Sequence, residues 1–273
     1  MASFISLFYN KLHELMNGSK SNVKYVRKEL KQKSEFKTLI SFEIKKLMKS
    51  KMYFLNSVIG GFIGIVIAIG ICYVLRTQSF VTDDGQDMSK YISEYGFCSV
   101  IIVNYMLGVN VPGQAIVSLE GKAFDSLKSM PINPKKWINA KILVSCGLSV
   151  AFSIIVSLIL IFSGAFSLFS CIMIFIIPII FMVGQNILLL YFDLKNPKLN
   201  WIDENGMNKQ ANSGVAVLLD LVEIIIDAIF LIGLSVINIY LACTIYMVFH
   251  LTLVIVIYLL MSNNIDKYYN RIN

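Results

Sequence analysis

Long runs of apolar residues, separated by short polar stretches, dominate the pattern along this chain of 273 residues. A bilayer core about 30 Å thick is crossed by roughly 20 predominantly apolar residues in an α-helix. Segments that meet this requirement cover residues 53–75, 96–119, 142–162, 166–192, 215–236 and 241–261. The pattern therefore predicts an all-α polytopic membrane protein with six transmembrane helices.

The predicted span 96–119 is more polar than the other five, because Asn104, Asn110, Pro112 and Gln114 interrupt it. A proline inside a helix removes one backbone hydrogen bond and clashes with the preceding turn. We expect Pro112 to kink this helix or to end it early. The assignment of this segment as a span depends partly on the topology.

Basic residues predict the orientation, because short cytoplasmic loops of membrane proteins are rich in Lys and Arg. With six spans, one side of the membrane holds 22 of these residues and the other holds only Arg76 and Lys90. This asymmetry predicts that both termini, the 119–141 loop and the 193–213 loop are cytoplasmic. Residues 77–94 form the only sizeable outer loop.

The expected domains are a basic and amphipathic cytoplasmic segment over residues 1–52, a transmembrane domain over 53–261 and a cytoplasmic tail over 262–273. Within residues 36–52, apolar positions recur at helical spacing with lysines on the other side. This pattern predicts an amphipathic helix along the cytoplasmic surface. Its apolar face is expected to carry Phe36, Leu39, Ile40, Ile44, Leu47 and Met48.

Three carboxylates interrupt the predicted fifth span. Asp220, Glu223 and Asp227 follow one another at i, i+3 and i+7, so they project from one helical face. Each costs on the order of 2.5 to 3.5 kcal/mol at the centre of a bilayer, and no Lys or Arg lies within a predicted span to pair with them. Two readings stay open. In the first, the stripe lines a substrate pathway that favours cationic or amphipathic cargo. In the second, Asp220 lies near enough to the cytoplasmic end to be in water, and the other two are neutral or hydrogen-bonded to polar groups such as Asn104 or Gln185.

Enzyme chemistry has little support in the sequence. The five cysteines are dispersed without a C-x-x-C pair, so neither a metal site nor a disulfide framework is expected. Gly121 and Lys122 lack the earlier glycine and the following Ser or Thr of an ATP-binding loop. We therefore expect no catalytic residue, bound cofactor, metal or nucleic-acid partner for this chain. The composition, 56% hydrophobic and 15% charged, agrees with a membrane protein.

The charged segment 118–141 lies between two predicted spans and contains the sequence AFDSLKSM, which can form about two helical turns. Pro131 and Pro134 are expected to end this helix and to stiffen the return. The segment could dock into a partner through an apolar anchor and a polar rim. Alternatively, it rests on lipid headgroups. The anchor would consist of Ala123, Phe124, Leu127 and Met130, and the rim of Glu120, Lys122, Asp125 and Lys128.

Two stretches together resemble bacterial ABC-2-type permeases. EGKAFDSLKSMPINPKKWINAK is similar to the segment between the second and third spans of that family, with matches at Glu120, Gly121, Lys122, Phe124, Leu127, Lys128, Ser129, Pro131, Ile132 and Lys141. NPKLNWIDENGMNKQ is similar to a later cytoplasmic loop, with matches at Pro197, Lys198, Trp201, Glu204, Lys209 and Gln210. The resemblance extends over nearly the whole chain from about residue 36, which corresponds to the second six-span half of such permeases.

The resemblance implies a permease subunit of an ATP-driven exporter in a bacterial plasma membrane. ATP would bind to a separate ATPase subunit, and a second six-span half, either another copy or a companion chain, would complete the pathway. It also implies that the 118–141 segment couples the permease to the ATPase through Glu120, Gly121, Lys122, Phe124, Leu127, Lys128 and Pro131.

Two other functions remain as alternatives. A secondary transporter would use the acidic stripe as a proton or cation site and would need no ATPase. A membrane scaffold or immunity-type protein would bind a partner through its basic N-terminal residues.

Overall fold

The computed structural model describes residues 34–77, 89–108, 111–203 and 213–272. The chain divides into two units, Met1–Ser34 and Glu35–Asn273, and every helix named below belongs to the second unit. The described residues are helical without strands. The helices are α2 Glu35–Lys49, α3 Lys51–Thr77, α4 Ser89–Tyr95, α5 Val100–Gly108, α6 Phe124–Lys128, α7 Pro134–Ile161, α8 Leu168–Lys195, α10 Ser213–Ala228, α11 Ile239–Asn263 and α12 Ile265–Arg271.

Four helices, α3, α7, α8 and α11, are long and apolar enough to cross a membrane. They coincide with four of the predicted spans. Many of their large apolar side chains, such as Val66, Tyr73 and Val248, face outward. A helix surface of this kind is stable in lipid and not in water. The protein is therefore membrane-embedded.

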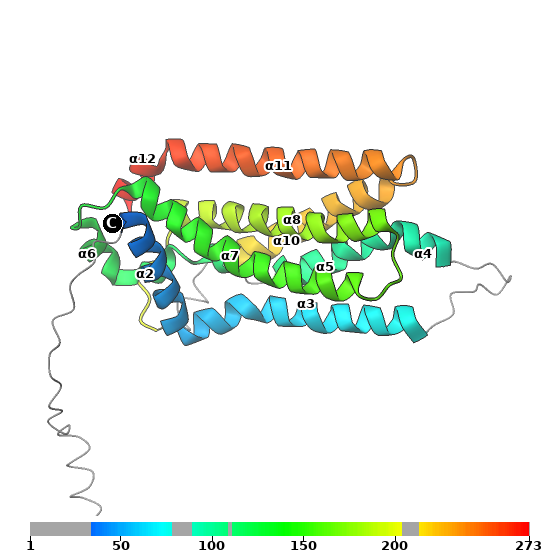
Figure 1. Ribbon diagram of the computed structural model, residues 1–273. Helices are drawn as coiled ribbons and strands as arrows, with labels where there is room; N and C mark the ends of the chain where they lie inside the picture. Colours follow the sequence, from blue (N-terminus) through cyan, green and yellow to red (C-terminus); the bar gives the residue numbers. More distant parts are fainter. Residues whose placement is uncertain (1–33, 78–88, 109–110, 204–212, 273) are drawn as a thin grey trace, which may run out of the picture. The chain divides into compact units, whose positions relative to one another are not determined.

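Contacts at the helix ends fix the directions of the four long helices (Figure 1). Arg76, at the end of α3, donates to the carbonyl oxygen of Phe162, just past α7, at 2.8 Å, so α3 and α7 run in the same direction. The rings of Phe169 in α8 and Tyr240 in α11 lie 4.7 Å apart at the beginnings of both helices. The helices α8 and α11 thus run together in the opposite direction.

Local sequence determines where the α7–α8 hairpin begins and turns. Asn133 caps α7 by accepting from the backbone N–H of Lys135, and Pro134 occupies the first turn, where its missing N–H costs nothing. Gly164 adopts φ +73° in the turn, and Ser167 caps α8 by accepting from the N–H of Ser170.

The predicted helix over 96–119 is not continuous, which corrects the sequence-based prediction. It consists of a 3₁₀ turn, η1 Gly96–Ser99, followed by α5, and then the short 3₁₀ turns η2 Pro112–Gln114 and η3 Ser118–Ala123. Pro112 begins η2 and supplies no N–H to continue the α-helix. The predicted fifth span forms α10 followed by a π-helical turn, η4 Ile229–Gly233, which the sequence did not predict.

The helix α2 forms over nearly the predicted residues, but its buried face differs from the predicted one. Leu39, Glu43 and Leu47 are buried, whereas Ile44 and Met48 are exposed. The carboxylate of Glu43 forms an ion pair with a buried lysine, and this contact sets the rotation of the helix. Further helices, α4 and α12, form in the segments expected to be an outer loop and a tail.

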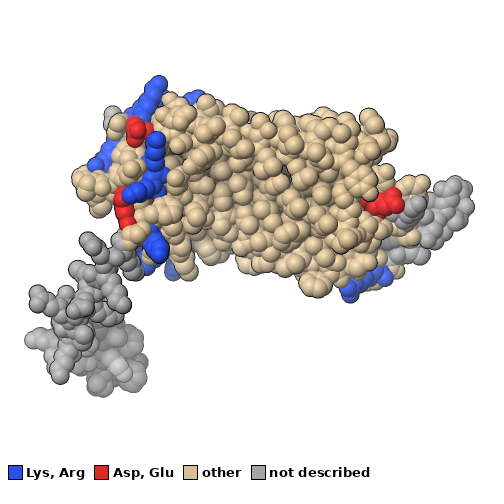
Figure 2. Space-filling model, turned by 45° about the horizontal axis from the view of Figure 1, so that its top comes forward, with Lys and Arg blue, Asp and Glu red and all other residues tan. Residues whose placement is uncertain are grey.

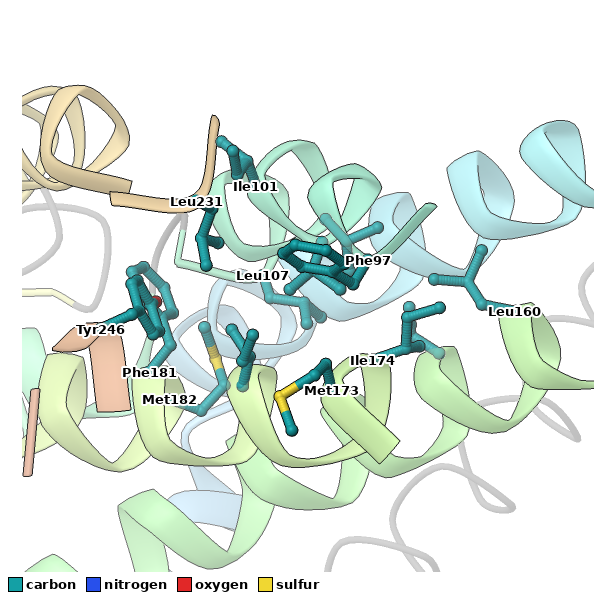
Figure 3. Close-up of a cluster of buried hydrophobic side chains, with 14 of the residues drawn as sticks. Phe97, Ile101, Leu107, Leu160, Met173, Ile174, Phe181, Met182, Leu231 and Tyr246 are labelled. Atoms are coloured by element: carbon teal, nitrogen blue, oxygen red, sulfur yellow. The ribbon is translucent and has the colours of Figure 1, made fainter. Parts of the chain in front are cut away.

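The main apolar core lies where η1, α5, α7, α8, η4 and α11 meet (Figure 3). Phe97, Leu160, Phe181, Leu231 and Tyr246 are among its buried side chains. A second core lies near the basic end of the helices and joins α6, α7, α8, α11 and α12. The charged segment 118–141 is therefore attached to the helical body through apolar packing.

Candidate functional site

The interrupted segment 111–123 is held inside the helical body by polar side chains of neighbouring helices. The N–H of Gly113 donates to Oδ1 of Asn186 at 3.1 Å, and the Tyr53 hydroxyl donates to the carbonyl oxygen of Pro112. The N–H groups of Val117 and Ser118 donate to Oδ2 of Asp193 at 2.7 and 2.9 Å. Irregular backbone at membrane depth requires such partners, because no water replaces the lost helical hydrogen bonds.

A buried ion cluster joins this segment to α2 and α7. Lys141 is fully buried, and its Nζ lies 3.0 Å from Oε2 of Glu43 and also contacts Glu120. The same Nζ donates to the carbonyl oxygen of Ile116 at 3.0 Å. Lys46 forms a second ion pair with Glu120. The cluster therefore connects three separate elements, α2, η3 and α7.

The charges of this cluster are set by burial and by their mutual attraction. Burial alone would raise the pKa of Glu120, but the ammonium groups of Lys141 and Lys46 lower it to about 2. Burial, together with the charge of Lys141, lowers the pKa of Lys46 to about 8. Glu120 is therefore ionised at neutral pH.

The structure brings together the two loops that carry the family resemblance. Gly121 adopts φ +54°, and a Cβ at this position would lie 2.8 Å from the Trp201 ring. Nε1 of Trp201 donates to the carbonyl oxygen of Ser118 at 2.8 Å, and the N–H of Lys198 donates to the Ser118 hydroxyl at 2.8 Å. Pro197 lies next to Lys198 in the same loop. The remaining predicted positions of this loop, Glu204, Lys209 and Gln210, lie outside the described residues.

Two side chains predicted to anchor a partner point into the protein instead. Phe124 is 1% exposed and Leu127 is 6% exposed, and the Phe124 ring packs 5.9 Å from Trp137 and 5.5 Å from Tyr269. The tail helix α12 supplies Tyr269 and covers Phe124, whose packing attaches α6 to the body. Predicted positions that do face outward are Lys122, Asp125, Met130 and Pro131, whereas Lys128 is partly buried and donates to the carbonyl oxygen of Ile272.

An apolar groove of about 460 Å³ separates α2 from the α6 region. It lies at the end of the unit where Lys and Arg gather (Figure 2). Exposed apolar side chains at the groove include Phe42 and Met130, which are 49% and 54% exposed. The apolar lining residues are Leu39, Phe42, Ala123, Leu127, Met130 and Ile132.

The acidic stripe occupies one face of α10, as its spacing predicts, and the structure shows that this face points into the protein. Asp220, Glu223 and Asp227 are all buried, while the neighbouring Leu218 and Val222 of α10 face outward. Nε2 of Gln185 in α8 donates to Oδ1 of Asp220, one of the partners considered from the sequence. The stripe is separate from the ion cluster and shares no contact with it among the interactions described here.

Several residues of the site escaped the sequence analysis. Tyr53, Asn186 and Asp193 bind the interrupted backbone, and Glu43 is not among the residues expected on the buried face of α2. The sequence does mark Asn186 and Asp193, because a polar residue within or next to a predicted span indicates a buried polar interaction. Glu43 had no comparable signal. Among the described residues, no group of three or more His, Cys, Asp or Glu side chains could hold a metal ion.

Comparisons with protein-family models, with curated proteins and with solved structures gave no match to this chain.

Proposed function

We propose that this chain is the transmembrane permease subunit of an ABC-2-type exporter, driven by a separate ATPase subunit. The observation that carries the proposal is the apolar groove between α2 and α6, at the basic end of the helices. An ATPase subunit must reach a permease from the cytoplasm, and the positive-inside rule puts the basic end there. The two loops that resemble the family also meet at this end.

Six membrane crossings are part of this proposal. The helix α3 ends on the side opposite to the beginning of α7, and α8 likewise ends opposite to the beginning of α11. This arrangement supports two further crossings, one between each pair of helices. The interrupted α5 segment and α10 with η4 are the described elements that can provide these crossings. Both termini and the loops 119–141 and 193–213 would be cytoplasmic.

In the proposed mechanism, the ATPase subunit contacts α2 and α6 and displaces them when it closes on ATP. Buried Glu43 and partly buried Lys46 of α2 bind Lys141 and Glu120, so the displacement passes to α7 and to the interrupted segment. Packed helices switch between discrete arrangements and do not deform continuously, so α2, α7 and the interrupted segment would move together. The substrate pathway between this chain and a second six-span half would then open to the other side. The chain itself hydrolyses nothing.

The test is co-purification with an ABC ATPase subunit encoded beside this chain. We expect the native chain to capture the ATPase from detergent-solubilised membranes and a Phe42→Gln, Met130→Gln double variant to lose this capture. Both side chains are exposed at the groove, so their replacement should leave the fold intact. Replacement of an exposed apolar contact that anchors a partner typically costs at least 2 kcal/mol, or roughly 30-fold in affinity.

Met48→Gln provides the matched control, since Met48 is 65% exposed on the same helix and does not line the groove. If the native chain and the double variant captured the ATPase subunit equally, the groove would not be the site of contact. No capture by any variant, together with transport driven by an ion gradient alone, would replace this proposal by ion-coupled transport.

A further inference from the structure

Polar side chains from three elements converge on the acidic stripe of α10. The helix α5 supplies Asn104, α8 supplies Gln185, and α11 supplies Tyr246 and His250. Nε2 of His250 lies 3.3 Å from Oδ1 of Asp227. The Tyr246 hydroxyl faces Asp227, Glu223 and Asn104. The position of Gly108 leaves room for this arrangement, because a Cβ there would lie 3.1 Å from Oδ1 of Asp220.

Many of these buried polar atoms have no hydrogen-bond partner. Asn104 is 0% exposed, and its side-chain amide faces the Tyr246 hydroxyl, which can pair with one of Oδ1 and Nδ2 and leaves the other unpaired. Gln185 is equally buried, and its Oε1 is unpaired although its Nε2 binds Asp220. Oε2 of Glu223 is also unpaired. Buried polar groups left unpaired cost about 1 to 3 kcal/mol each, so the site is built for a ligand that brings hydrogen bonds.

The charges of the cluster indicate what that ligand is. Of the described basic side chains, only His250 lies within ion-pair distance of a carboxylate of the stripe. If all three carboxyl groups of the stripe were ionised, a protonated His250 could compensate only one of them. At least two negative charges would then remain uncompensated inside the bilayer. The described residues offer no geometry for a metal ion here. Protons supply positive charge and hydrogen-bond donors without requiring a cavity.

We propose that Asp220, Glu223, Asp227 and His250 form an intramembrane proton-binding site. Protons shared among the three carboxyl groups neutralise the stripe and convert acceptor oxygens into donors, which can bind Oδ1 of Asn104 and Oε1 of Gln185. Each proton enters and leaves as H⁺ exchanged with water, with no bond to carbon formed or broken. The site does not depend on the ABC proposal and would serve an ATP-driven or an ion-driven transporter.

The π-helical turn η4 gives the site a means of exchange with water. It begins at Ile229, two residues after Asp227, on the same continuous helical segment. Such turns frequently lie at functional sites, where the extra residue per turn permits local rearrangement. A shift of α10 against α5 and α11 would change which carboxyl groups are covered and therefore how many protons they hold.

Infrared difference spectroscopy of the purified native chain in lipid nanodiscs tests the proposal. Protonated carboxyl groups have a carbonyl stretch distinct from that of carboxylates, and it shifts in heavy water. We expect the native chain to show this band at neutral pH and to lose it on titration to alkaline pH. The band should decrease stepwise in Asp220→Asn, Glu223→Gln and Asp227→Asn, and should persist in Asp266→Asn, whose carboxyl group is exposed on α12.

Absence of the band from the folded native chain at neutral pH would overturn the proposal, and this result needs no variant to fold. Disappearance of the band on addition of sodium or potassium at constant pH would also overturn it, in favour of a metal-cation site. Retention of the full band in the triple Asn/Gln/Asn variant would assign the protons to other carboxyl groups. The ATPase co-purification assay is independent, so failure of either proposal can be recognised without the other.

Discussion

Lys141 illustrates how one buried residue can join several elements. Its ammonium group lies between two carboxylates, Glu43 and Glu120, which come from α2 and η3. It also lies 5.0 Å from the centre of the Trp137 ring, which adds a cation–π contact. A buried pair is not a strong net source of stability, but removal of one partner leaves an uncompensated charge.

We expect Lys141→Met to destabilise the protein by about 3 to 5 kcal/mol, because the buried carboxylate of Glu43 loses its counter-charge and Glu120 keeps only Lys46. Thermal unfolding of the purified protein in detergent measures the effect. Adding Glu43→Gln to the same chain should restore much of the loss, since the orphaned charge is then removed while Glu120 keeps its pair with Lys46.

The exposed pair between Lys136 and Glu35 provides the matched control for Lys141→Met. Its side chains are 49% and 39% exposed, so Lys136→Met should change the stability by less than about 1 kcal/mol. An equal effect of Lys141→Met and Lys136→Met would contradict the role assigned to the buried cluster.

At the scale of elements, the interrupted segment shows how a helix can be broken inside a membrane protein. Backbone groups of the segment form hydrogen bonds with the side chains of Tyr53, Asn186 and Asp193, which replace the missing helical hydrogen bonds. The approach of η2 to α8 is so close that a Cβ on Gly113 would lie 2.4 Å from the carbonyl oxygen of Asn186. The nearest atoms belong to backbone, which cannot move aside as a side chain can.

Gly113→Ala is therefore expected to destabilise the protein by at least about 1 to 3 kcal/mol, the usual cost of overpacking. Gly147→Ala in α7 has the opposite expected sign, because nothing lies within 4 Å of its Cβ and alanine favours the helix by about 0.5 to 1 kcal/mol. Thermal unfolding of both variants in the same detergent makes the comparison. Equal shifts would show that η2 does not approach α8 as described.

The elements also show where sequence reasoning was sufficient. The lengths of α3, α7, α8 and α11 follow from apolar runs, which any membrane-crossing helix needs. Pro112 indicated the interruption after α5. The rotation of α2 could not be predicted, because Glu43 faces inward only when Lys141 and Glu120 are already in place. Helical periodicity alone predicts that charged residues face the solvent, so it gives no reason to expect Glu43 on the buried face.

At the scale of the whole molecule, the proposed orientation can be measured by cysteine labelling. Ser126 is exposed at the basic end and Ile237 is 77% exposed in the turn before α11. In intact cells, we expect a membrane-impermeant thiol reagent to label Ile237→Cys and not Ser126→Cys. Permeabilised cells should give labelling of both positions.

The native chain serves as the background control, since its cysteines are partly or fully buried. Labelling of Ser126→Cys in intact cells would reverse the orientation. Labelling of both positions from the same side would contradict the six-span topology.

The sequence alone determined that this protein lies in a membrane, where its long helices run and that three carboxylates share a helical face. These properties depend on local composition and on the 3.6-residue period of the helix, which neighbouring residues specify by themselves. The tertiary structure decided that Phe124 is covered by α12, that Glu43 binds Lys141, and that Asn104 and His250 join the acidic stripe. Each of these contacts joins residues far apart along the chain, and only the packing of the helices sets the distances between them.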